Sequence, residues 1–310
     1  MDIQNILKKS AQELDQAGSP TPEIDARVLL EFTLNKPHEY LMAHTYEPLT
    51  NSAYSKFRRL IRRRKKGEPI AYITKHKEFF SYDFYINKNV LVPRPESEML
   101  VEIAMQLLEL RIKNYELSKK LPNTEKPQLS ILDIGTGSGN IIISLALETL
   151  KLRSSIPMPS FYASDISKKA LYVARKNAKN HKVNKKIRFF LSDLFSNSKM
   201  PKKYDLIIAN LPYVPILSKK LKVKSKKHWK IPISYEPTNA IFAHKNGTKI
   251  INNFLKQALT RINDDGMILI EADPRNIESI SIYAKKLYKN SKIKIIADLE
   301  DKKRVLKVLT

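Results

Sequence analysis

A glycine-rich loop follows one apolar segment near the middle of the chain and precedes another. Three of the seven glycines of the protein fall within its five residues, which are Gly135, Thr136, Gly137, Ser138 and Gly139. Glycine permits a tight turn and a close approach of backbone N–H groups to a ligand at a helix N-terminus. The spacing G-x-G-x-G differs from the dinucleotide-binding pattern, and no Lys-Ser/Thr pair follows it. We therefore predict a ligand loop of another kind.

Three acidic residues stand close to the ends of three successive apolar segments. Asp133 precedes the glycine loop, Asp165 ends FYASD, and Asp193 follows FFLS. A carboxylate beside the loop favours a cationic ligand, and Asp165 is placed to accept hydrogen bonds from ribose hydroxyls. Asp193 can receive an adenine amino group, with Leu194 or Phe195 covering the ring. Each acid alone also fits a helix N-cap or a solvated turn, but together they suit a nucleoside with positive charge, such as S-adenosylmethionine.

A fourth apolar segment, YDLIIA, ends in Asn210, which carries both an acceptor oxygen and a donor NH2. This oxygen and a backbone carbonyl near Leu211 would hold the NH2 of a planar amide or of an exocyclic amine. Pro212 stiffens the turn, and the ring of Tyr213 can stack on the planar group. The chemistry would then need mainly alignment for in-line methyl transfer and stabilisation of partial positive charge on nitrogen. We expect no metal, because the six histidines show no ligand spacing.

Apolar and amphipathic segments alternate from about residue 96 onward. The pattern predicts helices over 97–112, 140–150, 168–180, 248–263 and 276–288, and strands over 129–135, 161–167, 186–193, 204–210, 266–272, 292–298 and 304–310. Such alternation predicts an α/β fold with a mostly parallel sheet covered on both faces. The short connection between the last two strands favours an antiparallel edge hairpin.

The part before residue 96 has a different pattern. Residues 1–66 have apolar residues at helical spacing, and residues 67–95 resemble a hairpin link because EFFSYDFYIN alternates between apolar and polar residues. The segment 58–66 contains seven basic residues. This run is either a solvated helix face or a contact for an acidic partner such as RNA. Segments at about 115–128 and 215–234, rich in Lys and Pro, are predicted loops.

The composition is that of a globular protein, with 42% hydrophobic and 28% charged residues among 310. Cysteine is absent, and no apolar run approaches the roughly 18–20 residues of a membrane span. We therefore expect a cytoplasmic protein with no membrane association. The net charge of +25 is compatible with direct nucleic-acid binding but does not require it, because a Lys-rich composition can also reflect genome bias.

Eight motifs along the chain together resemble one family. They are SPTPEIDARVLLEFTL, GEPIAYITKHKEFFSYDFYI, VLVPRPESEMLVE, ILDIGTGSGNIIISLA, ASDIS, SDLF, SYEPTNAIFAHKNGT and DLEDKKRVL. With them the chain looks like a class I S-adenosylmethionine-dependent methyltransferase, and more closely it resembles the release factor glutamine methyltransferases. The resemblance implies a Rossmann-like, seven-stranded domain over 96–310, a small helical substrate-docking domain over 1–66 and a β-hairpin linker over 67–95.

That family methylates the side-chain amide N5 of the glutamine in the GGQ motif of class 1 peptide chain release factors. The resemblance thus implies S-adenosylmethionine as the cofactor and the GGQ loop of a release factor as the partner. Its cofactor loop corresponds to residues 133–139, its ribose site to Asp165 and its adenine site to Asp193. It also implies that Asn210 and Pro212-Tyr213 grip the glutamine amide, with Glu236-Pro237 supporting the pocket.

Two places differ from the family pattern. The family usually has Asn-Pro-Pro-Tyr where this chain has Asn210-Leu211-Pro212-Tyr213, and Asn-Leu-Pro-Tyr is also found in rRNA adenine-N6 dimethyltransferases. The expected Glu-x-Gly-x-x-Gln after the fifth strand appears as EADPRN over 271–276. The second difference concerns the local turn more than the chemistry.

Three alternatives to glutamine methylation of release factors differ in how well they fit the sequence. Leu211 and the net charge favour an rRNA adenine-N6 methyltransferase, but in those enzymes the cofactor loop lies close to the N-terminus, whereas about 130 residues precede it here. A non-catalytic RNA- or ribosome-binding protein would have a damaged cofactor site, yet Asp133, the glycines, Asp165 and Asn210 are all in place. A glutamine in a ribosomal protein is an alternative substrate for the same pocket.

Overall fold

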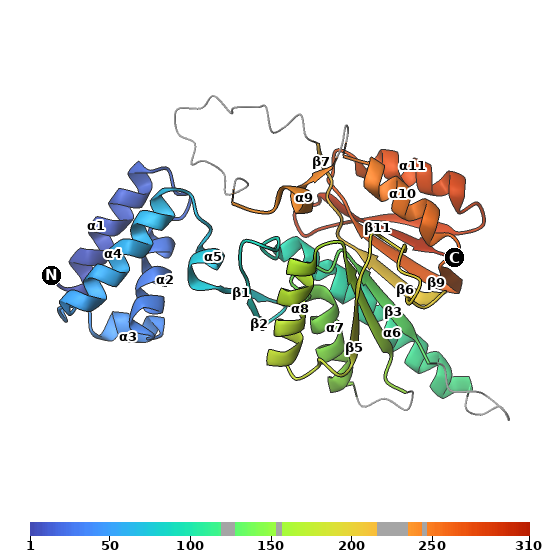
Figure 1. The fold of residues 1–310 in the computed structure, drawn as a ribbon, viewed down its shortest axis with the longest axis horizontal. Helices are drawn as coiled ribbons and strands as arrows, with labels where there is room; N and C mark the ends of the chain where they lie inside the picture. Colours follow the sequence, from blue (N-terminus) through green and yellow to red (C-terminus); the bar gives the residue numbers. More distant parts are fainter. Residues whose placement is uncertain (119–127, 153–156, 216–234, 244–246) are drawn as a thin grey trace. The chain divides into compact units, whose positions relative to one another are not determined.

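The computed structural model describes residues 1–118, 128–152, 157–215, 235–243 and 247–310 (Figure 1). The chain divides into two compact units. Unit 1 comprises Met1–His76, Ile86–Lys88 and Leu221–Pro237. In the last of these segments, the structure describes residues 235–237. Unit 2 comprises Lys77–Tyr85, Asn89–Lys220 and Thr238–Thr310.

Unit 1 is helical, as predicted for residues 1–66. Its helices are α1 (Ile3–Gln16), α2 (Pro22–Leu34), α3 (His38–Ala43), α4 (Asn51–Lys65) and the short α5 (Ile70–Thr74). Asp2 caps α1 by accepting a hydrogen bond from the backbone N–H of Asn5, and Thr50 caps α4 in the same way. The apolar faces of these helices form one core, which includes Leu14, Leu29 and Phe57.

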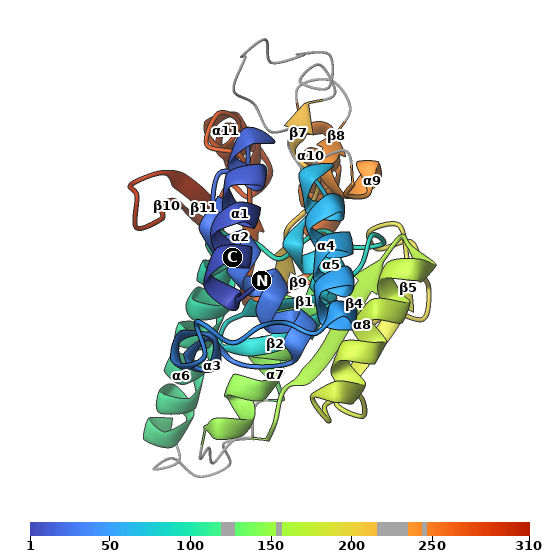
Figure 2. The ribbon, with the colours of Figure 1, turned by 90° about the vertical axis from the view of Figure 1, so that its left-hand side faces the viewer.

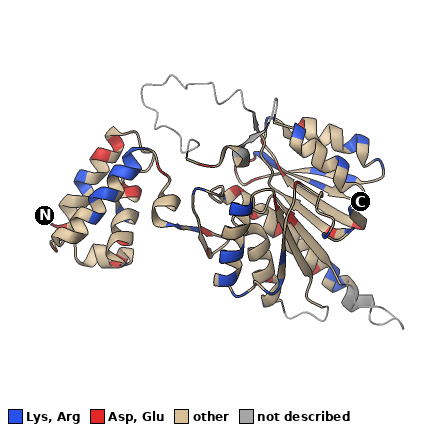
Figure 3. Ribbon diagram, in the orientation of Figure 1, with Lys and Arg blue, Asp and Glu red and all other residues tan. Residues whose placement is uncertain are grey.

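Basic residues of α4, coloured blue in Figure 3, form ion pairs within unit 1. Arg58 donates to Glu13 at 2.8 Å, and Arg64, which is buried, donates to Asp25 at 2.7 Å. Four of the seven basic residues predicted as a solvated or RNA-binding run form such ion pairs: Arg58, Arg63, Arg64 and Lys65. Much of this charge therefore serves the internal packing of unit 1.

Unit 2 contains a seven-stranded sheet in the order β10-β11-β9-β6-β3-β4-β5. Its strands are β3 (Ser130–Ile134), β4 (Ser160–Asp165), β5 (Ile187–Leu191), β6 (Tyr204–Ala209), β9 (Ile262–Glu271), β10 (Lys292–Ala297) and β11 (Lys303–Leu309). Five neighbouring strands run parallel, and β11 is antiparallel to both β9 and β10. The predicted seven strands and the antiparallel final hairpin are confirmed. Of the two hairpin strands, β10 forms the edge, because β11 lies between β9 and β10.

Helices cover both faces of this sheet (Figures 1 and 2). One face carries α6 (Glu98–Ser118), α7 (Asn140–Lys151) and α8 (Lys168–Asn180), and the other carries α10 (Lys249–Ala258) and α11 (Ile277–Leu287). The remaining elements are the 3-10 turn η1 (Pro95–Ser97), α9 (Thr238–Ile241) and the paired strands β7 (Val214–Pro215) and β8 (Phe242–Ala243). In the described part of the chain, every helix is too short or too polar to cross a lipid bilayer.

The predicted hairpin link consists of β1 (His76–Phe79) and β2 (Tyr82–Tyr85), preceded by α5, which was not predicted. Phe80 and Ser81 both have positive φ, as a type I′ turn requires. The buried side chain of Asn177 on α8 accepts from the N–H of Tyr85 and donates to the carbonyls of Tyr85 and Ser138. It therefore joins the hairpin to the glycine loop.

Two predicted loops differ from the structure in extent. The helix α6 continues through Ser118, so the loop predicted from about residue 115 begins later. The segments 119–127 and 216–234 lie outside the described residues.

The buried ion pair of unit 1 gives a stability prediction. Asp25→Asn leaves the Arg64 guanidinium buried without its carboxylate, so we expect unit 1 to lose about 3–5 kcal/mol of stability. Hydrogen exchange of residues 1–76 in the full chain would measure this loss. The exposed Glu23→Gln on the same helix should change stability by no more than about 0.5 kcal/mol. Equal protection in both variants would contradict the prediction.

Candidate active site

The register of the parallel strands places four residues along one edge of the sheet. Ile134 lies opposite both Ser164 and Ala209, and Ala209 lies opposite Ile270. The next residue on each strand therefore reaches the carboxyl edge at the same level, where doubly wound sheets bind ligands. These four residues are Gly135, Asp165, Asn210 and Glu271.

Asp133 is buried below the glycine loop, with 1% of its surface exposed. Its Oδ2 accepts a hydrogen bond from Thr136 Oγ1 at 2.6 Å, whereas no donor from the described part of the chain reaches Oδ1. Burial, reinforced by the negative charge of Asp165, raises the pKa of Asp133 to about 7. An unpartnered buried carboxylate oxygen fits a cationic or N–H-bearing ligand, so the donor set is compatible with a positively charged cofactor.

Asp165 ends β4 and supports the same loop. Its Oδ2 accepts from the N–H of Gly137 at 2.9 Å, and its Oδ1 accepts from the N–H of Ser167 at 2.8 Å. Burial raises its pKa, and these two backbone donors oppose the rise. Each carboxylate oxygen has a second lone pair, so Asp165 retains acceptor capacity for ribose hydroxyls. That role stays a prediction.

The predicted adenine site follows β5. Asp193 is exposed, whereas Leu194 and Phe195 are buried in the core between the sheet and α10. The Phe195 ring stacks on Phe254 with centroids 5.9 Å apart. The carboxylate of Asp193 is thus accessible, and covering of the adenine by Leu194 or Phe195 stays a prediction.

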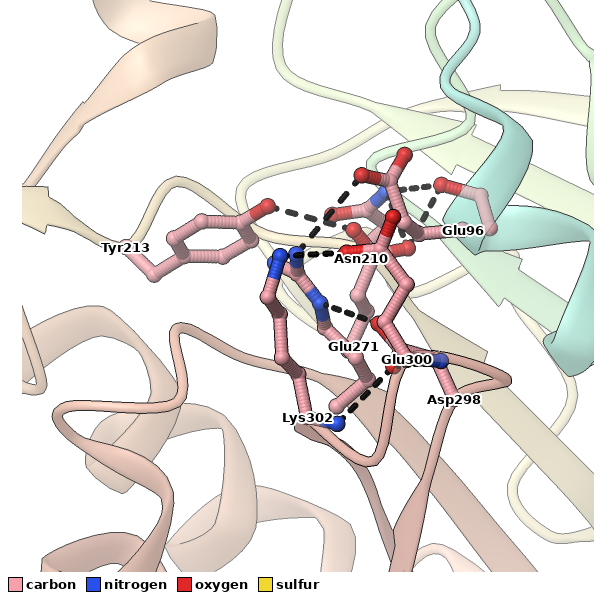
Figure 4. Close-up of polar contacts among 9 residues, drawn as sticks. Glu96, Asn210, Tyr213, Glu271, Asp298, Glu300 and Lys302 are labelled. Atoms are coloured by element: carbon pink, nitrogen blue, oxygen red, sulfur yellow. Dashed lines mark hydrogen bonds and ion pairs between the residues drawn. The ribbon is translucent and has the colours of Figure 1, made fainter.

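Asn210 lies in a polar cluster with Ser97 and Glu271 (Figure 4). Its Nδ2 donates to Ser97 Oγ and to Glu271 Oε2, both at 2.9 Å. Both acceptors lie on the same side of this nitrogen. Its Oδ1 accepts no hydrogen bond from the described residues, and its role as an acceptor for a substrate stays a prediction.

Glu271 is the centre of this cluster, with 2% of its surface exposed. Besides the amide of Asn210, it accepts from Ser97 Oγ at 2.5 Å and from the Tyr213 hydroxyl at 3.1 Å. Burial raises the pKa of Glu271, and the bonds from Ser97 and Tyr213 oppose the rise. Burial and the neighbouring Glu271 also raise the pKa of Tyr213, so its hydroxyl stays protonated as a donor.

A second layer of charges surrounds this cluster (Figure 4). Arg304 on β11 pairs with Asp298 at 3.0 Å and with Glu96 at 3.6 Å. Glu96 precedes Ser97 in η1. The C-terminal hairpin therefore helps to hold the turn that carries the Ser97 hydroxyl.

The side chain of Leu211 points into the core and is 5% exposed. Its Cδ2 lies 3.1 Å from the position that a Cβ on Gly135 would occupy. Pro212 is partly buried and follows Leu211 in the turn. Glu236 and Pro237 belong to unit 1 and Asn210 to unit 2, so their support of one pocket stays a prediction.

Two residues that contact Asn210 were not predicted from the sequence, namely Ser97 and Glu271. A signal for Glu271 was present, because it ends the apolar run MILIE as Asn210 follows LIIA. Ser97 has no such signal. In the described part of the chain, no group of three or more His, Cys, Asp or Glu side chains is arranged to hold a metal ion.

Two family models match this chain. The family described as "Methyltransferase domain" matches residues 125–309, and the one described as "PrmC N-terminal domain" matches residues 5–74. Among solved structures, the catalytic domain of hMettl16 in complex with a MAT2A 3'UTR hairpin has a TM-score of 0.51 at 13% identity, covering 77% of this chain and 80% of that chain. This structure shows the fold alone.

The chain thus has the seven-stranded fold of a class I methyltransferase, and a methyltransferase domain model matches this part of it. The "Release factor glutamine methyltransferase" of Koribacter versatilis is 31% identical over 88% of this chain and 89% of its own length. The "Bifunctional methyltransferase" of Rickettsia conorii is 33% identical over 90% of this chain. The chain belongs to the release factor glutamine methyltransferase family. It spans about half the length of the Rickettsia relatives, 52% in the case of R. conorii.

The glycine loop yields a prediction from the close packing of α7 and α8. A Cβ on Gly139 would lie 2.8 Å from Ile143 Cδ1 and 3.2 Å from Ala174 Cβ, whereas a Cβ on Gly137 meets nothing closer than 3.9 Å. Both glycines have positive φ, so alanine strains the backbone at either position. We therefore expect Gly139→Ala to lower the free energy of unfolding by about 1–3 kcal/mol more than Gly137→Ala. Urea unfolding without ligand measures the difference, and equal losses would contradict it.

Proposed function

We propose that this protein transfers a methyl group from S-adenosylmethionine to the side-chain amide N5 of the glutamine in the GGQ motif of a class 1 peptide chain release factor. The observation that carries the proposal is the Asn210 amide, whose Nδ2 donates to Ser97 and Glu271 and whose Oδ1 accepts no hydrogen bond from the described residues at this edge of the sheet. Membership of the release factor glutamine methyltransferase family supports the choice of substrate.

The residues around the glycine loop would bind the cofactor, which supplies an electrophilic methyl group on a sulfonium. Asp133 would offer its unpartnered Oδ1 to the positive charge of the amino-acid part. Asp165 would accept from the ribose hydroxyls, and Asp193 from the adenine amino group. The glycine loop leads into α7 and would let the backbone approach the cofactor closely.

Asn210 would orient the nucleophile. An amide nitrogen is a weak nucleophile, because its lone pair is delocalised into the carbonyl group. Oδ1 and a backbone carbonyl of the turn around Leu211 would accept the two N–H groups and aim the nitrogen at the methyl carbon. The same acceptors stabilise the positive charge that develops on this nitrogen during transfer. Tyr213, anchored through its hydroxyl to Glu271, would flank the amide.

Core packing explains the presence of Leu211, the residue that makes the sequence motif similar to that of adenine methyltransferases. Its side chain lies in the core beside Gly135. An amide substrate would use a backbone carbonyl of this turn, which leucine provides as well as proline does. A substrate glutamine in a ribosomal protein would use the same groups, so the choice between protein substrates depends on the experiment.

The decisive experiment offers three substrates to the purified protein with radiolabelled S-adenosylmethionine. They are a release factor, ribosomal RNA and ribosomal proteins. We expect label on the GGQ peptide of the release factor and none on a release factor whose GGQ glutamine is replaced by alanine. Label on RNA alone, or on ribosomal proteins alone, would refute the proposal.

The role of Asn210 predicts a selective loss of catalysis. Asn210→Ala removes the acceptor for the glutamine amide, so kcat should fall on the order of 10²-fold or more while cofactor affinity changes little. Steady-state kinetics and calorimetry of cofactor binding measure the two quantities. The exposed Asn253→Ala on α10 should match the wild type in both. A loss confined to cofactor affinity would contradict the assigned role.

Asp133 predicts a pH-dependent affinity for the cofactor. Because its pKa is raised to about 7, the side chain gains a proton and loses its charge as the pH falls from 8 to 6. The affinity for S-adenosylmethionine should then fall, by at most about tenfold per pH unit below 7. Asp133→Asn should bind more weakly at pH 8 and lack this dependence. Titration of the cofactor's own amino group is common to both proteins, so identical pH profiles would contradict the prediction.

A further inference from the structure

The side-chain amide of Asn210 can present either of two opposite surfaces to a substrate. Its oxygen accepts hydrogen bonds and its NH2 group donates them, and a half-turn about the last side-chain bond exchanges the two. Only the orientation with Oδ1 outward can accept from the NH2 group of a glutamine. The inner surroundings of the amide must therefore select this orientation.

Those surroundings consist of an acceptor pair. Glu271 Oε2 and Ser97 Oγ each lie 2.9 Å from Nδ2, and they are joined to each other at 2.5 Å. Because the Ser97 hydroxyl donates its hydrogen to Glu271, its oxygen is left as an acceptor toward Asn210. Both residues are 2% exposed, so water has little access to replace either bond. With the amide reversed, Oδ1 would face the carboxylate oxygen, and the NH2 group would lose both acceptors.

We propose that Glu271, with Ser97, is the positioning residue that holds the Asn210 amide with Oδ1 toward the substrate. Its catalytic meaning rests on the proposed function, whereas the orientation itself does not. The bond from the Tyr213 hydroxyl to Oε1 fixes the carboxylate from its other side. Arg304 lies in the next layer, where it pairs with Glu96 and Asp298.

The carboxylate also changes the electron distribution of the amide. A negative charge on the N–H side of an amide polarises it and increases the electron density on its oxygen. Oδ1 then becomes a stronger acceptor for a nitrogen that gains positive charge. In the transfer, the bond from nitrogen to the methyl carbon forms as the carbon–sulfur bond breaks, and the electron pair stays on sulfur. The surplus proton on the substrate nitrogen is released to water, so neither Asn210 nor Glu271 accepts it.

Four proteins test this proposal by their kcat for methylation of a release factor: the wild type, Glu271→Gln, Asn210→Asp and the double variant. Glu271→Gln should lower kcat roughly tenfold to hundredfold, the range for loss of a charged hydrogen bond. Asn210→Asp should be more severe, because two carboxylates then face each other. In the double variant, the new amide can donate to the new carboxylate, so kcat should rise at least about tenfold above that of Asn210→Asp alone.

The effect of Glu271→Gln on kcat should change sign between the two backgrounds, and this reversal separates positioning from a merely structural role. Glu271→Gln is harmful beside asparagine and beneficial beside aspartate, an outcome that simple destabilisation of the fold does not produce. Glu278→Gln, which removes an exposed carboxylate paired with Lys303, should leave all values unchanged. Wild-type kcat in Glu271→Gln, or an equal fractional loss in both backgrounds, would overturn the proposal.

A second measurement is independent of the methylation assay. In the wild-type protein, the side-chain NH2 signals of Asn210, assigned by their loss in Asn210→Asp, should exchange slowly with solvent. Glu271→Gln and Ser97→Ala should each accelerate this exchange at least about tenfold, because an acceptor is weakened or lost. Fast exchange in the wild type would overturn the proposed orientation. Slow exchange without methylation of a release factor would support the orientation and refute the proposed function.

Discussion

Parallel pairing of β3, β6 and β9 is the constraint on which the rest of the site depends. Because Ile134, Ala209 and Ile270 lie side by side, the residue after each leaves the sheet at the same level. Side chains alternate between faces along a strand, so Asn210 and Glu271 reach the same side of the sheet. A shift of one residue in β6 would turn Asn210 toward the apolar core under α10 and α11. The core that fixes the register therefore also fixes the chemistry.

The same alternation accounts for Leu211. It follows Asn210 and so points to the opposite side, where it packs with the core residues Ile207 and Ala209 and lies beside Gly135. A leucine is a good residue for such a position, because it fills a buried space without a polar group to satisfy. The identity of this side chain is thus a property of the core. The sequence motif combines two separate requirements in adjacent residues.

Much of the fold and part of the site could be predicted from sequence, because both depend on local patterns. The strands, the glycine loop and the polar residues at strand ends are all short-range signals, and Glu271 followed the same rule one strand further along. Ser97 could not be predicted, since its bond to Glu271 spans 174 positions and a serine in a turn has no periodic pattern. The ion pairs of the basic run of α4 could not be predicted for the same reason. The carboxylate partners of Arg58 and Arg64 lie 45 and 39 positions away, in other helices.

Two buried acids at this edge of the sheet differ in how completely their oxygens are satisfied, and this difference separates their roles. Glu271 accepts from three side chains, so its surroundings offset the cost of burial and hold it rigidly. Asp133 receives one hydrogen bond, and its Oδ1 has no partner among the described residues. An unsatisfied buried group costs about 1–3 kcal/mol, which a ligand with positive charge recovers when it binds. A carboxylate whose oxygens are all hydrogen-bonded is suited to orient a neighbour, whereas one with an unpartnered oxygen is suited to bind a ligand. The strand order places Glu271 on one side of Asn210 and Asp133 on the other.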